Sequence, residues 1–450
     1  SSMSVSLEPA KCSSTFSSFA QVSESYVQEV IIKSKPKSCV LDPVPTTVLK
    51  QAQDVLVGPL TDIINASFQT GIFPTVLKKG VVHPSLKKLK RDYEQYSSYR
   101  PITNIAFLSK IIERLATSQT MNYLIDNSLL PKFQSAYRLH HSTETALVRV
   151  FNDILKTIDK HQEIVLVLLD LSSAFDTIDH GALLTRLRDC YGFTGTVLLW
   201  FESYLTKRTQ SVIIKDTQSS DLPVSYGVPQ GSVLGPLLFS LFFAPLEEVI
   251  AAHGLNCMIY ADDTQLYVSI NPRKREHDLS PIESCTKDIM TWCASNGLSC
   301  NADKTEVIHI SSRYSNSEKI DKIRIGDTTI IPTPTVRDLG TTLDSHLDLG
   351  KHINNICKSA SFAIKNIGRI RRYLSQSDCE RIIHAFITSK LDYCNAILYG
   401  LPQIQLDKLQ RVQNTAARIV SKTKKSEPIT PILRSLHWLP IQKRIIFKLL

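Results

Sequence analysis

The segment from Ile164 to Leu171 constrains the fold of this chain more than any other, because it is apolar throughout except for Asp170. A continuous apolar run of this length is typical of a strand that is buried on both faces of a sheet. A carboxylate at the end of such a strand costs on the order of several kcal/mol unless it is paired or bound to a metal ion. Asp170 is therefore predicted to have a partner, either an Arg in a structural ion pair or a metal ion.

Two further carboxylates, Asp262 and Asp263, stand between two apolar, β-prone runs, Cys257–Tyr260 and Thr264–Ile270. The pattern predicts a hairpin with both acids at its tip. Adjacent like charges disfavour each other's ionisation unless a cation lies between them. A solvated turn is the alternative, since Asp is common in turns. Together with Asp170, however, the pair predicts a two-metal phosphoryl-transfer site, with ions about 3.5–4 Å apart. Oxygen-only ligands favour Mg²⁺.

Six sequence blocks occur in a fixed order along the chain. They are Ser97–Ile102, Gln134–Arg138 with His141–Ala146, Asp170–Asp176, Gly227–Pro236, Tyr260–Asp263 and Asn301–Thr305. In this order they resemble the reverse transcriptases of non-LTR (LINE-type) retrotransposons, and the resemblance covers most of the sequence. It implies an α+β right-hand polymerase with fingers, a palm built on an antiparallel sheet and a helical thumb. The implied activity is RNA-directed DNA polymerase.

The resemblance also implies which residues hold the metal ions. Asp170, Asp262 and Asp263 would be the catalytic ligands, and the backbone carbonyl of Leu171 would supply a further oxygen. The expected ion is Mg²⁺, with Mn²⁺ as an alternative.

The segment after these ligands is expected to meet the incoming nucleotide. Backbone N–H groups of Ser172, Ser173, Ala174 and Phe175 would face the triphosphate, because short side chains let the main chain approach an anion closely. The Phe175 ring would lie under the sugar as a steric gate that excludes a 2′-hydroxyl. An ordinary core aromatic is the alternative for Phe175. A gate at this position also disfavours a polymerase that makes RNA.

Gln230 and Gly231 are predicted to form a turn that enters the buried helix Val233–Phe243, with Gly235-Pro236 interrupting the first turn of that helix. Gly231 would permit close backbone approach. By resemblance, Gln230 would contact the incoming nucleotide. A turn selected only for its geometry is the alternative.

Three cations complete the expected site. Lys304 matches the family's lysine that approaches the pyrophosphate, where it could stabilise or protonate the leaving group. A solvated surface lysine is the alternative. Arg100 and Arg138 resemble finger residues whose guanidinium groups could hold phosphates.

The net charge of +10 is concentrated near the C-terminus. From residue 341 onward there are 18 Lys and Arg against 7 Asp and Glu, a balance of +11, which leaves −1 for residues 1–340. Several of these cations follow one predicted helix: Lys351, Lys358, Lys365, Arg369, Arg371 and Arg372. The pattern suits a thumb helix that binds the template–primer duplex. A solvated basic face of a helical bundle is the alternative.

The positions of these motifs predict three regions: an N-terminal helical extension (1–72), fingers and palm (73–344), and a basic helical thumb with the start of a C-terminal region (345–450). Val336–Gly340 resembles the family's primer-grip turn. The family often has an aromatic residue or Asn where this chain has Asp338. Because an acid is unfavourable beside a phosphate backbone, primer contact by the Asp338 side chain is not expected.

The ten scattered cysteines show neither zinc-ligand spacing nor a disulfide framework. No segment is predicted to span a membrane. The expected partners are an RNA template, a DNA primer, target DNA and dNTPs, whereas no feature predicts a protein partner. An intracellular location is expected, in the nucleus at the integration site and in the cytoplasm as a ribonucleoprotein. Nothing resembles the endonuclease of these elements, and a fragment is expected. The rival function is a decayed or repurposed element copy that binds nucleic acid without polymerising.

Overall fold

The computed structural model describes residues 13–87, 92–172, 175–273, 275–301, 304–315, 318 and 320–450. The chain forms two compact units, each assembled from separate segments. Unit 1 comprises Ser1–Tyr137, Leu171–Ala252 and Asp288–Asn301, and unit 2 comprises Arg138–Asp170, His253–Lys287 and Ala302–Leu450. The predicted boundaries at residues 72 and 344 stay predictions.

The α-helices are α1 (Glu24–Lys33), α2 (Thr46–Gln51), α3 (Gln53–Thr70), α4 (Phe107–Asp126), α5 (Thr143–Asp159), α6 (His180–Tyr191), α7 (Gly195–Leu205), α8 (Gly235–Phe243), α9 (Leu246–Ala252), α10 (Arg275–Ser295), α11 (Gly350–Ile370), α12 (Gln376–Ile383), α13 (Ser389–Asp392), α14 (Gln403–Ser421), α15 (Ile429–Ser435) and α16 (Ile441–Leu449). Short 3-10 and π turns connect several of them: η1 (Thr75–Leu77), η2 (Tyr96–Ser98), η4 (Arg371–Tyr373), η5 (His384–Thr388) and η6 (Asn395–Leu398).

The strands are β1 (Lys79–Leu86), β2 (Tyr99–Ile105), β3 (Glu163–Leu169), β4 (Leu171–Ser172), β5 (Arg208–Ile214), β6 (Thr217–Gln218), β7 (Leu222–Val224), β8 (Asn256–Tyr260), β9 (Asp263–Ile270), β10 (Ser299–Cys300), β11 (Glu306–Ile310), β12 (Ile323–Ile325), β13 (Thr328–Ile330), β14 (Thr335–Asp338) and β15 (Thr341–Asp344).

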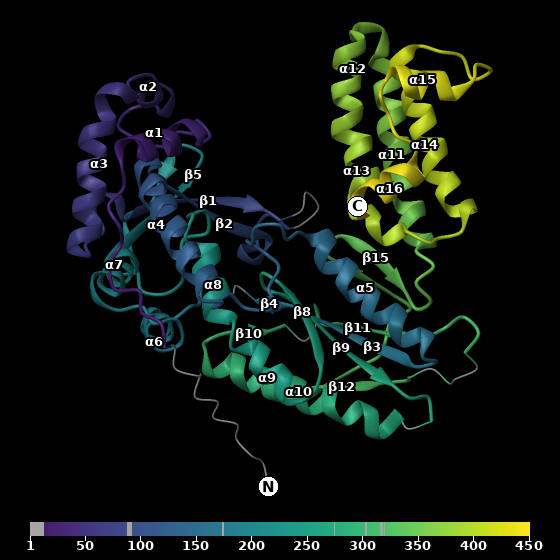
Figure 1. Ribbon diagram of the computed structural model, residues 1–450, viewed down its shortest axis with the longest axis horizontal. Coiled ribbons are helices and arrows are strands. Elements are labelled where there is room, and N and C mark those ends of the chain that lie inside the picture. The colour runs from purple at the N-terminus through teal and green to yellow at the C-terminus, as the bar shows by residue number, and fades with distance from the viewer. Residues whose placement is uncertain are drawn as a thin grey trace. The chain divides into compact units, whose positions relative to one another are not determined.

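Unit 2 is built on an antiparallel sheet of order β11-β3-β9-β8. The apolar run predicted as a doubly buried strand is β3, an inner strand of this sheet, and nearly all of it is buried. Helix α5 packs against β3 and β8 (Figure 1). A hydrogen bond of 2.6 Å from the Tyr267 hydroxyl to Asp153 ties β9 to α5. The prediction for β3 is therefore confirmed.

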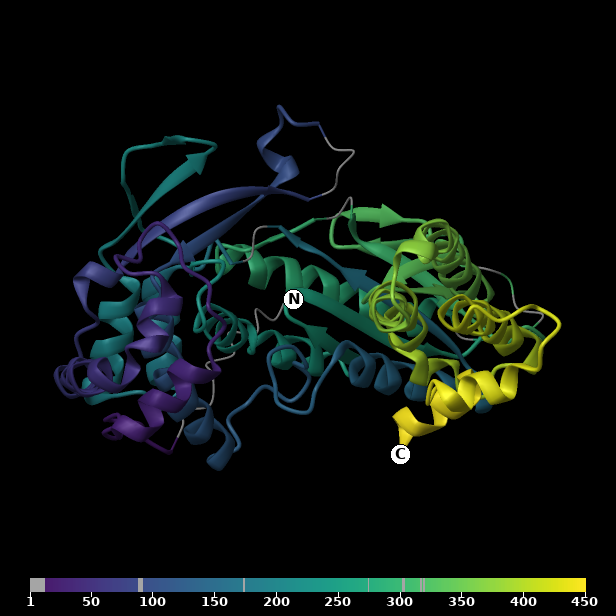
Figure 2. The same cartoon turned by 90° about the horizontal axis from the view of Figure 1, so that it is seen from above.

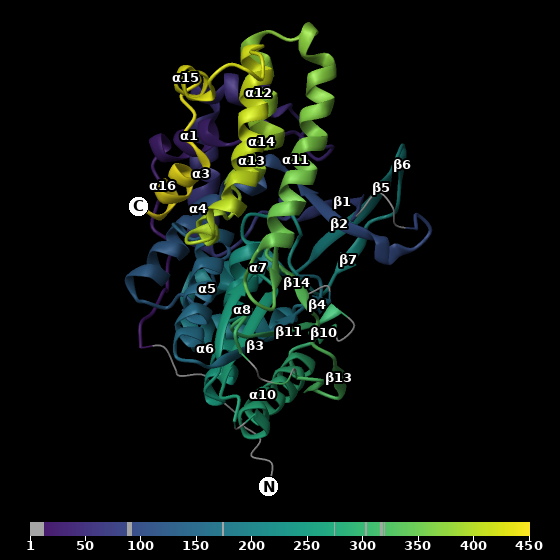
Figure 3. The ribbon, with the colours of Figure 1, turned by 90° about the vertical axis from the view of Figure 1, so that its right-hand side faces the viewer.

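The C-terminal part of unit 2 is helical. Helix α11 follows the β14–β15 hairpin, contacts β15 and stands out in Figure 3 as the long green helix. It packs along α14 through apolar side chains that include Ile353, Ala360 and Ile364. The predicted basic helix corresponds to α11, and its lysines Lys351, Lys358 and Lys365 are exposed. The prediction was wrong for Arg371, which lies in η4 after the end of α11 and is buried, because its guanidinium donates to the carbonyls of Ile419, Leu374 and Val420.

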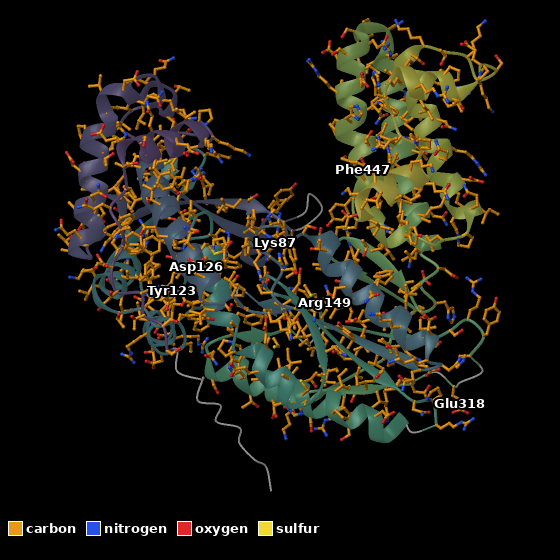
Figure 4. The ribbon with its side chains drawn as sticks, viewed as in Figure 1. Lys87, Tyr123, Asp126, Arg149, Glu318 and Phe447 are labelled. Carbon is orange, nitrogen blue, oxygen red and sulfur yellow. The ribbon has the colours of Figure 1, made fainter. Side chains whose placement is uncertain are left out.

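Unit 1 contains a five-stranded sheet in which β1 pairs with β2 and β5, while β5 also pairs with β6 and β7. In Figure 2, β1 and β2 form a long two-stranded ribbon. The helices of this unit enclose an aromatic core around Trp200, whose ring packs against Phe73 and Tyr204. Tyr123 of α4, which is labelled in Figure 4, belongs to the helical part of this unit. Its ring stacks on Phe16, and its hydroxyl donates a 2.8 Å hydrogen bond to the carbonyl of Tyr191.

Two local predictions meet different outcomes. The N-terminal segment is helical, as predicted, and consists of α1, α2 and α3. The prediction that Gly235-Pro236 interrupts a helix was wrong, because α8 begins at Gly235 with Pro236 in its first turn. Proline suits that position, since the first N–H groups of a helix have no intrahelical acceptor and the proline φ angle is already helical.

Among the described residues, one stretch, Gly235–Ala252, is long and apolar enough to pass a length-and-composition test for a membrane span. It comprises α8 and α9, and 56% of it is buried inside the structure. A buried core helix passes the same test.

Candidate active site

The predicted acidic hairpin is present in unit 2. Strand β8 ends at Tyr260, which pairs with Asp263 at the start of β9, so Ala261 and Asp262 form a two-residue turn. Ala261 has a φ of 58°, the left-handed conformation that tight hairpin turns require. In the neighbouring strand, Leu169 pairs with Thr264 of β9. Asp170, which follows Leu169, is therefore presented at the same end of the sheet as the hairpin tip.

Electrostatics show that these carboxylates interact. Desolvation by the surrounding chain, together with repulsion from Asp262 and Asp170, raises the pKa of Asp263 to about 6. A carboxyl between two others keeps its proton longer because ionisation would place like charges side by side. The three acids are therefore close enough for their charges to influence one another.

Lys304 also belongs to this group. Its ammonium lies 2.9 Å from Oδ2 of Asp170, and the two side chains are 55% and 34% exposed. An exposed ion pair of this kind contributes little to stability because water screens it. The pairing therefore places two predicted catalytic groups together, and the partner of Asp170 is a Lys rather than the Arg of the alternative interpretation.

The donor chemistry fits a hard divalent cation, since the group offers carboxylate oxygens whose mutual repulsion a cation would relieve. Within the described part of the chain, no three His, Cys, Asp or Glu side chains are already arranged to hold a metal ion. In the structure, the charge beside Asp170 comes from the ammonium of Lys304.

A fourth acid, Asp338, interacts with this group through the charge of Asp263. Asp338, at the end of β14, is 3% exposed and accepts a 2.8 Å hydrogen bond from Nε2 of Gln265 on β9. Burial, followed by repulsion from Asp263, raises the pKa of Asp338 to about 7. Oδ2 of Asp338 and Oε1 of Gln265 have no hydrogen-bond partner. The Asp338 side chain thus points into the protein, in agreement with the expectation that it does not contact primer.

The turn that resembles the primer grip lies between β14 and β15, immediately after Asp338. Gly340 has a φ of 85°, and a Cβ atom there would lie 3.1 Å from the ring of Tyr393. The Tyr393 hydroxyl donates a 2.8 Å hydrogen bond to the carbonyl of Leu339. The turn is therefore held by a side chain from the helical part of unit 2.

Unit 1 contains the predicted glutamine turn. The backbone carbonyl of Gln230 accepts a 2.8 Å hydrogen bond from the N–H of Thr103 on β2. Gly231 has a φ of 130°, and a Cβ atom there would lie 2.4 Å from the carbonyl oxygen of Thr103. The predicted need for close backbone approach is thus explained by β2. The Gln230 side chain donates a 2.7 Å hydrogen bond from Nε2 to Oδ2 of Asp176.

A buried carboxylate fixes the start of α8. Oε2 of Glu113, on α4, accepts hydrogen bonds of 2.6 Å from the N–H of Val233 and 3.2 Å from that of Leu234. Ser109 donates to Oε1 of the same side chain. Burial raises the pKa of Glu113, whereas Arg208 and the backbone donors lower it. An acid that accepts from N–H groups at a helix start satisfies donors that would otherwise lack partners.

The predicted nucleotide segment is only partly described. Leu171 and Ser172 form β4, which pairs with β10, whereas Ser173 and Ala174 lie outside the described residues. Phe175 is half-buried, and its ring stacks on Phe239 of α8 with centroids 4.4 Å apart. This packing fixes the ring plane and is compatible with both the gate and the core interpretation.

A pocket of about 390 Å³ opens beside the glutamine turn. Its lining combines the five-stranded sheet with the segment before the turn: Gly80, Val82, Pro101, Thr103, Asp176, Arg208, Thr209, Gln210, Val212, Val224, Tyr226, Gly227, Val228, Pro229 and Gln230. The other two predicted cations fall in different units, because Arg100 is an exposed residue of β2 in unit 1 and Arg138 precedes α5 in unit 2.

Comparisons with known proteins agree with this geometry. Residues 86–343 match the family model described as reverse transcriptase (RNA-dependent DNA polymerase). The chain therefore belongs to the reverse transcriptase family, which confirms the predicted fold class and the resemblance to non-LTR retrotransposon enzymes. Reverse transcriptases in general use divalent metal ions and act on a template, a primer and dNTPs.

Three similar relatives come from Drosophila melanogaster mobile elements. The chain is 27% identical to the RNA-directed DNA polymerase from mobile element jockey, over 88% of this chain and 43% of the relative. It is 26% identical to the probable RNA-directed DNA polymerase from transposon BS, over 93% of this chain and 47% of the relative. It is 27% identical to the probable RNA-directed DNA polymerase from transposon X-element, over 88% of this chain and 43% of the relative. The chain thus spans less than half the length of these relatives.

Sequence reasoning missed three polar groups, two in unit 1 and one in unit 2. Asp176 stood inside a recognised block without an assigned role, although an acid six residues after Asp170 was a visible signal. Glu113 lies in the middle of α4, and its capping of a distant helix leaves no local pattern. The Gln265–Asp338 pair joins residues 73 positions apart, so no spacing rule reveals it.

Proposed function

We propose that this protein is an RNA-directed DNA polymerase of a non-LTR retrotransposon. It extends the 3′-hydroxyl of a DNA primer with dNTPs on an RNA template. The observation that carries the proposal is the electrostatic group at one end of the unit 2 sheet, where the pKa of Asp263 is raised to about 6 by burial and by Asp262 and Asp170. Family membership supports the same reaction.

The proposed ion is Mg²⁺, with Mn²⁺ as an alternative, held by Asp170, Asp262, Asp263 and the carbonyl of Leu171. When bound, the ion would supply positive charge that favours ionisation of the attacking hydroxyl and offsets the charge of the pyrophosphate. These carboxylates fit that role because they are hard oxygen donors that repel one another in its absence.

The remaining predicted residues divide the other tasks. Lys304 is proposed to stabilise or protonate the leaving pyrophosphate, and its contact with Asp170 keeps the ammonium within the acidic group. Backbone N–H groups of Ser172, Ser173 and Ala174 are proposed to bind the triphosphate, and Phe175 is proposed to exclude the 2′-hydroxyl.

Gln230 and Gly231 are proposed to contact the incoming nucleotide, and Arg100 and Arg138 are proposed to bind phosphates. The exposed lysines of α11 are proposed to bind the template–primer duplex. Target DNA as the source of the primer, a nuclear site of action and a cytoplasmic ribonucleoprotein remain parts of the same proposal.

Extension of a labelled DNA primer on an RNA template, with dNTPs and Mg²⁺, tests the function. The wild-type protein is expected to extend the primer, and Asp262→Ala is expected to lose extension while it keeps template binding. Asp216→Ala, in the turn between β5 and β6, serves as the control for loss of an exposed acid. Template binding by the wild type without any extension would contradict the proposal and would favour a copy that only binds nucleic acid.

A further inference from the structure

Two cysteines of unit 1 face each other beside the short strand β4. Cys293 lies near the end of α10 and is 1% exposed, whereas Cys300 lies in β10 and is half-buried. Their Sγ atoms are 3.5 Å apart, which is the contact distance of two free thiols. Bonded sulfur atoms are about 2 Å apart. The two thiols are therefore placed for disulfide formation.

A helix cap holds the first thiol in place. The N–H of Leu298 donates a 2.8 Å hydrogen bond to the carbonyl of Cys293, and the N–H of Gly297 donates a 3.2 Å hydrogen bond to the carbonyl of Ala294. Gly297 has a φ of 68°, so the pattern is a Schellman motif that ends α10. The chain turns back at this cap and brings Cys300 beside Cys293.

Arg186 of α6 secures the same cap from a second helix. Its guanidinium donates a 2.7 Å hydrogen bond to Oδ1 of Asn296 and another hydrogen bond to the carbonyl of Phe242. It also lies over the ring of Trp292, 5.7 Å from the centroid. Because its own backbone and α6 both hold the end of α10, Cys293 is the fixed side of the cysteine pair.

The other side of the pair is joined to the segment that follows Asp170. Cys300 pairs with Leu171, and Ser299 pairs with Ser172, in the two-stranded sheet of β10 and β4. A shift of β10 toward α10 therefore draws β4 with it. The carbonyl of Leu171 is a proposed metal ligand, and the N–H of Ser172 is proposed to bind the triphosphate. The state of the two thiols is thus connected to the reacting groups by one backbone ladder.

We propose that Cys293 and Cys300 form a redox modification site, at which a reversible disulfide displaces β4 and slows polymerisation. The inference rests on the proposed polymerase function and adds a regulatory site to it. Closing the bond shortens the distance between the Sγ atoms by about 1.5 Å. Because the end of α10 is fixed, β10 is the element expected to move.

A low-molecular-weight disulfide such as glutathione disulfide is the proposed oxidant. The thiolate of Cys300 attacks first, because this side chain is the more exposed of the two, and one glutathione leaves as a mixed disulfide forms. The thiolate of Cys293 then attacks Sγ of Cys300, and the second glutathione leaves. The two protein thiols are oxidised, one glutathione disulfide is reduced to two glutathiones, and the two thiol protons end on those products.

Mass spectrometry after treatment with glutathione disulfide tests the bond itself. Trypsin releases both cysteines in one peptide, residues 288–304, because no Lys or Arg lies between Lys287 and Lys304. In the oxidised whole protein this peptide is expected to be lighter by two hydrogen atoms and to resist alkylation. Dithiothreitol is expected to restore alkylation at both thiols. Alkylation at both thiols after oxidation, or a peptide that keeps one glutathione, would overturn the inference.

Primer extension by the reduced and the oxidised protein measures the consequence. Oxidation of the wild type is expected to slow extension at least about tenfold, because small displacements at a reacting centre have effects of this size. Dithiothreitol is expected to reverse the loss. Cys300→Ser and Cys293→Ala are each expected to make extension insensitive to the oxidant. Cys39→Ser, which removes a half-buried cysteine from another segment of unit 1, is expected to respond as the wild type does.

Equal inhibition of the wild type and Cys300→Ser by the oxidant would overturn the inference, since another thiol would then be responsible. Disulfide formation without slower extension would also overturn it. Absence of extension by the reduced wild type would contradict the proposed function instead. In that case, hydrogen exchange of the peptide that carries Leu171 measures the displacement of β4. Exchange is expected to change on oxidation of the wild type and to stay constant in Cys300→Ser, and no change in the wild type would reject the site.

Discussion

The carboxylate group of unit 2 and the glutamine turn of unit 1 handle acidic side chains in opposite ways. At the turn, Glu113 accepts from backbone N–H groups, and Asp176 accepts from Gln230. At the end of the β3–β9 pair, Asp263 faces two other acids and its pKa rises to about 6. The acids at the turn therefore accept hydrogen bonds from neighbouring groups, whereas the acids of unit 2 repel one another even though Lys304 lies beside Asp170. A bound cation is expected to relieve that repulsion.

The largest expected effect comes from Asp263→Asn, which removes one charge from the carboxylate group of unit 2. Primer extension is expected to fall by at least about 100-fold, because a preorganised charge at the reacting centre is lost. The metal-free variant is expected to unfold at a higher temperature than the wild type, because repulsion among the acids is relieved. Single-turnover extension and thermal unfolding without metal measure the two effects. Normal primer extension by Asp263→Asn would contradict the catalytic role of the unit 2 carboxylates.

Glu113→Ala tests how much the hydrogen-bonded carboxylate at the start of α8 stabilises unit 1. This change leaves the N–H groups of Val233 and Leu234 without an acceptor, and it is expected to lower the free energy of unfolding by about 3 kcal/mol. Urea unfolding measures the loss. Glu29→Ala is the matched control, since Glu29 is an exposed acid of α1 whose loss is expected to change stability little. Equal losses in both variants would show that the Glu113 cap is not a stabilising feature.

The close backbone approach at the same turn predicts a smaller loss for Gly231→Ala. Its φ of 130° and the contact of a new Cβ with the Thr103 carbonyl both oppose an alanine, and the expected cost is about 1–3 kcal/mol. Gly254→Ala separates the two causes, because Gly254 has a φ of 68° and a Cβ atom added there would meet no other atom within 4 Å. If the two variants unfold alike in urea, the contact with β2 contributes nothing.

The last expected effect depends on pH and involves Asp338. The folded protein holds this proton up to a pKa of about 7, whereas an unfolded chain releases it near pH 4. Stability of the wild type is therefore expected to fall as pH rises from about 4 to about 7, and then to level off. Asp338→Asn is expected to match the wild type at pH 4 and to exceed it by up to about 4 kcal/mol at pH 8, because each unit of pKa rise is worth about 1.4 kcal/mol. Parallel pH profiles of unfolding free energy for the two proteins would exclude this linkage.

The sequence predicted the parts of the site that local patterns encode. The apolar run of β3 and the hairpin around Asp262 follow from strand periodicity and turn chemistry, so the three carboxylates could be placed at one end of a sheet. The start of α8 was misplaced because proline was interpreted as a breaker instead of a first-turn residue. The capping by Glu113 and the Gln265–Asp338 bond depend on tertiary contacts between distant segments. Such contacts have no local signature and could not be predicted.

Binding of Mn²⁺ followed by electron paramagnetic resonance tests the central claim most directly, because it reports the cation without requiring turnover. The wild type is expected to bind Mn²⁺, Mg²⁺ is expected to compete, and Asp170→Asn and Asp263→Asn are each expected to weaken binding at least tenfold. Asp62→Ala is expected to bind as the wild type does. Equal Mn²⁺ affinity in the wild type and in both carboxylate variants would contradict the assignment of these acids to a common cation site.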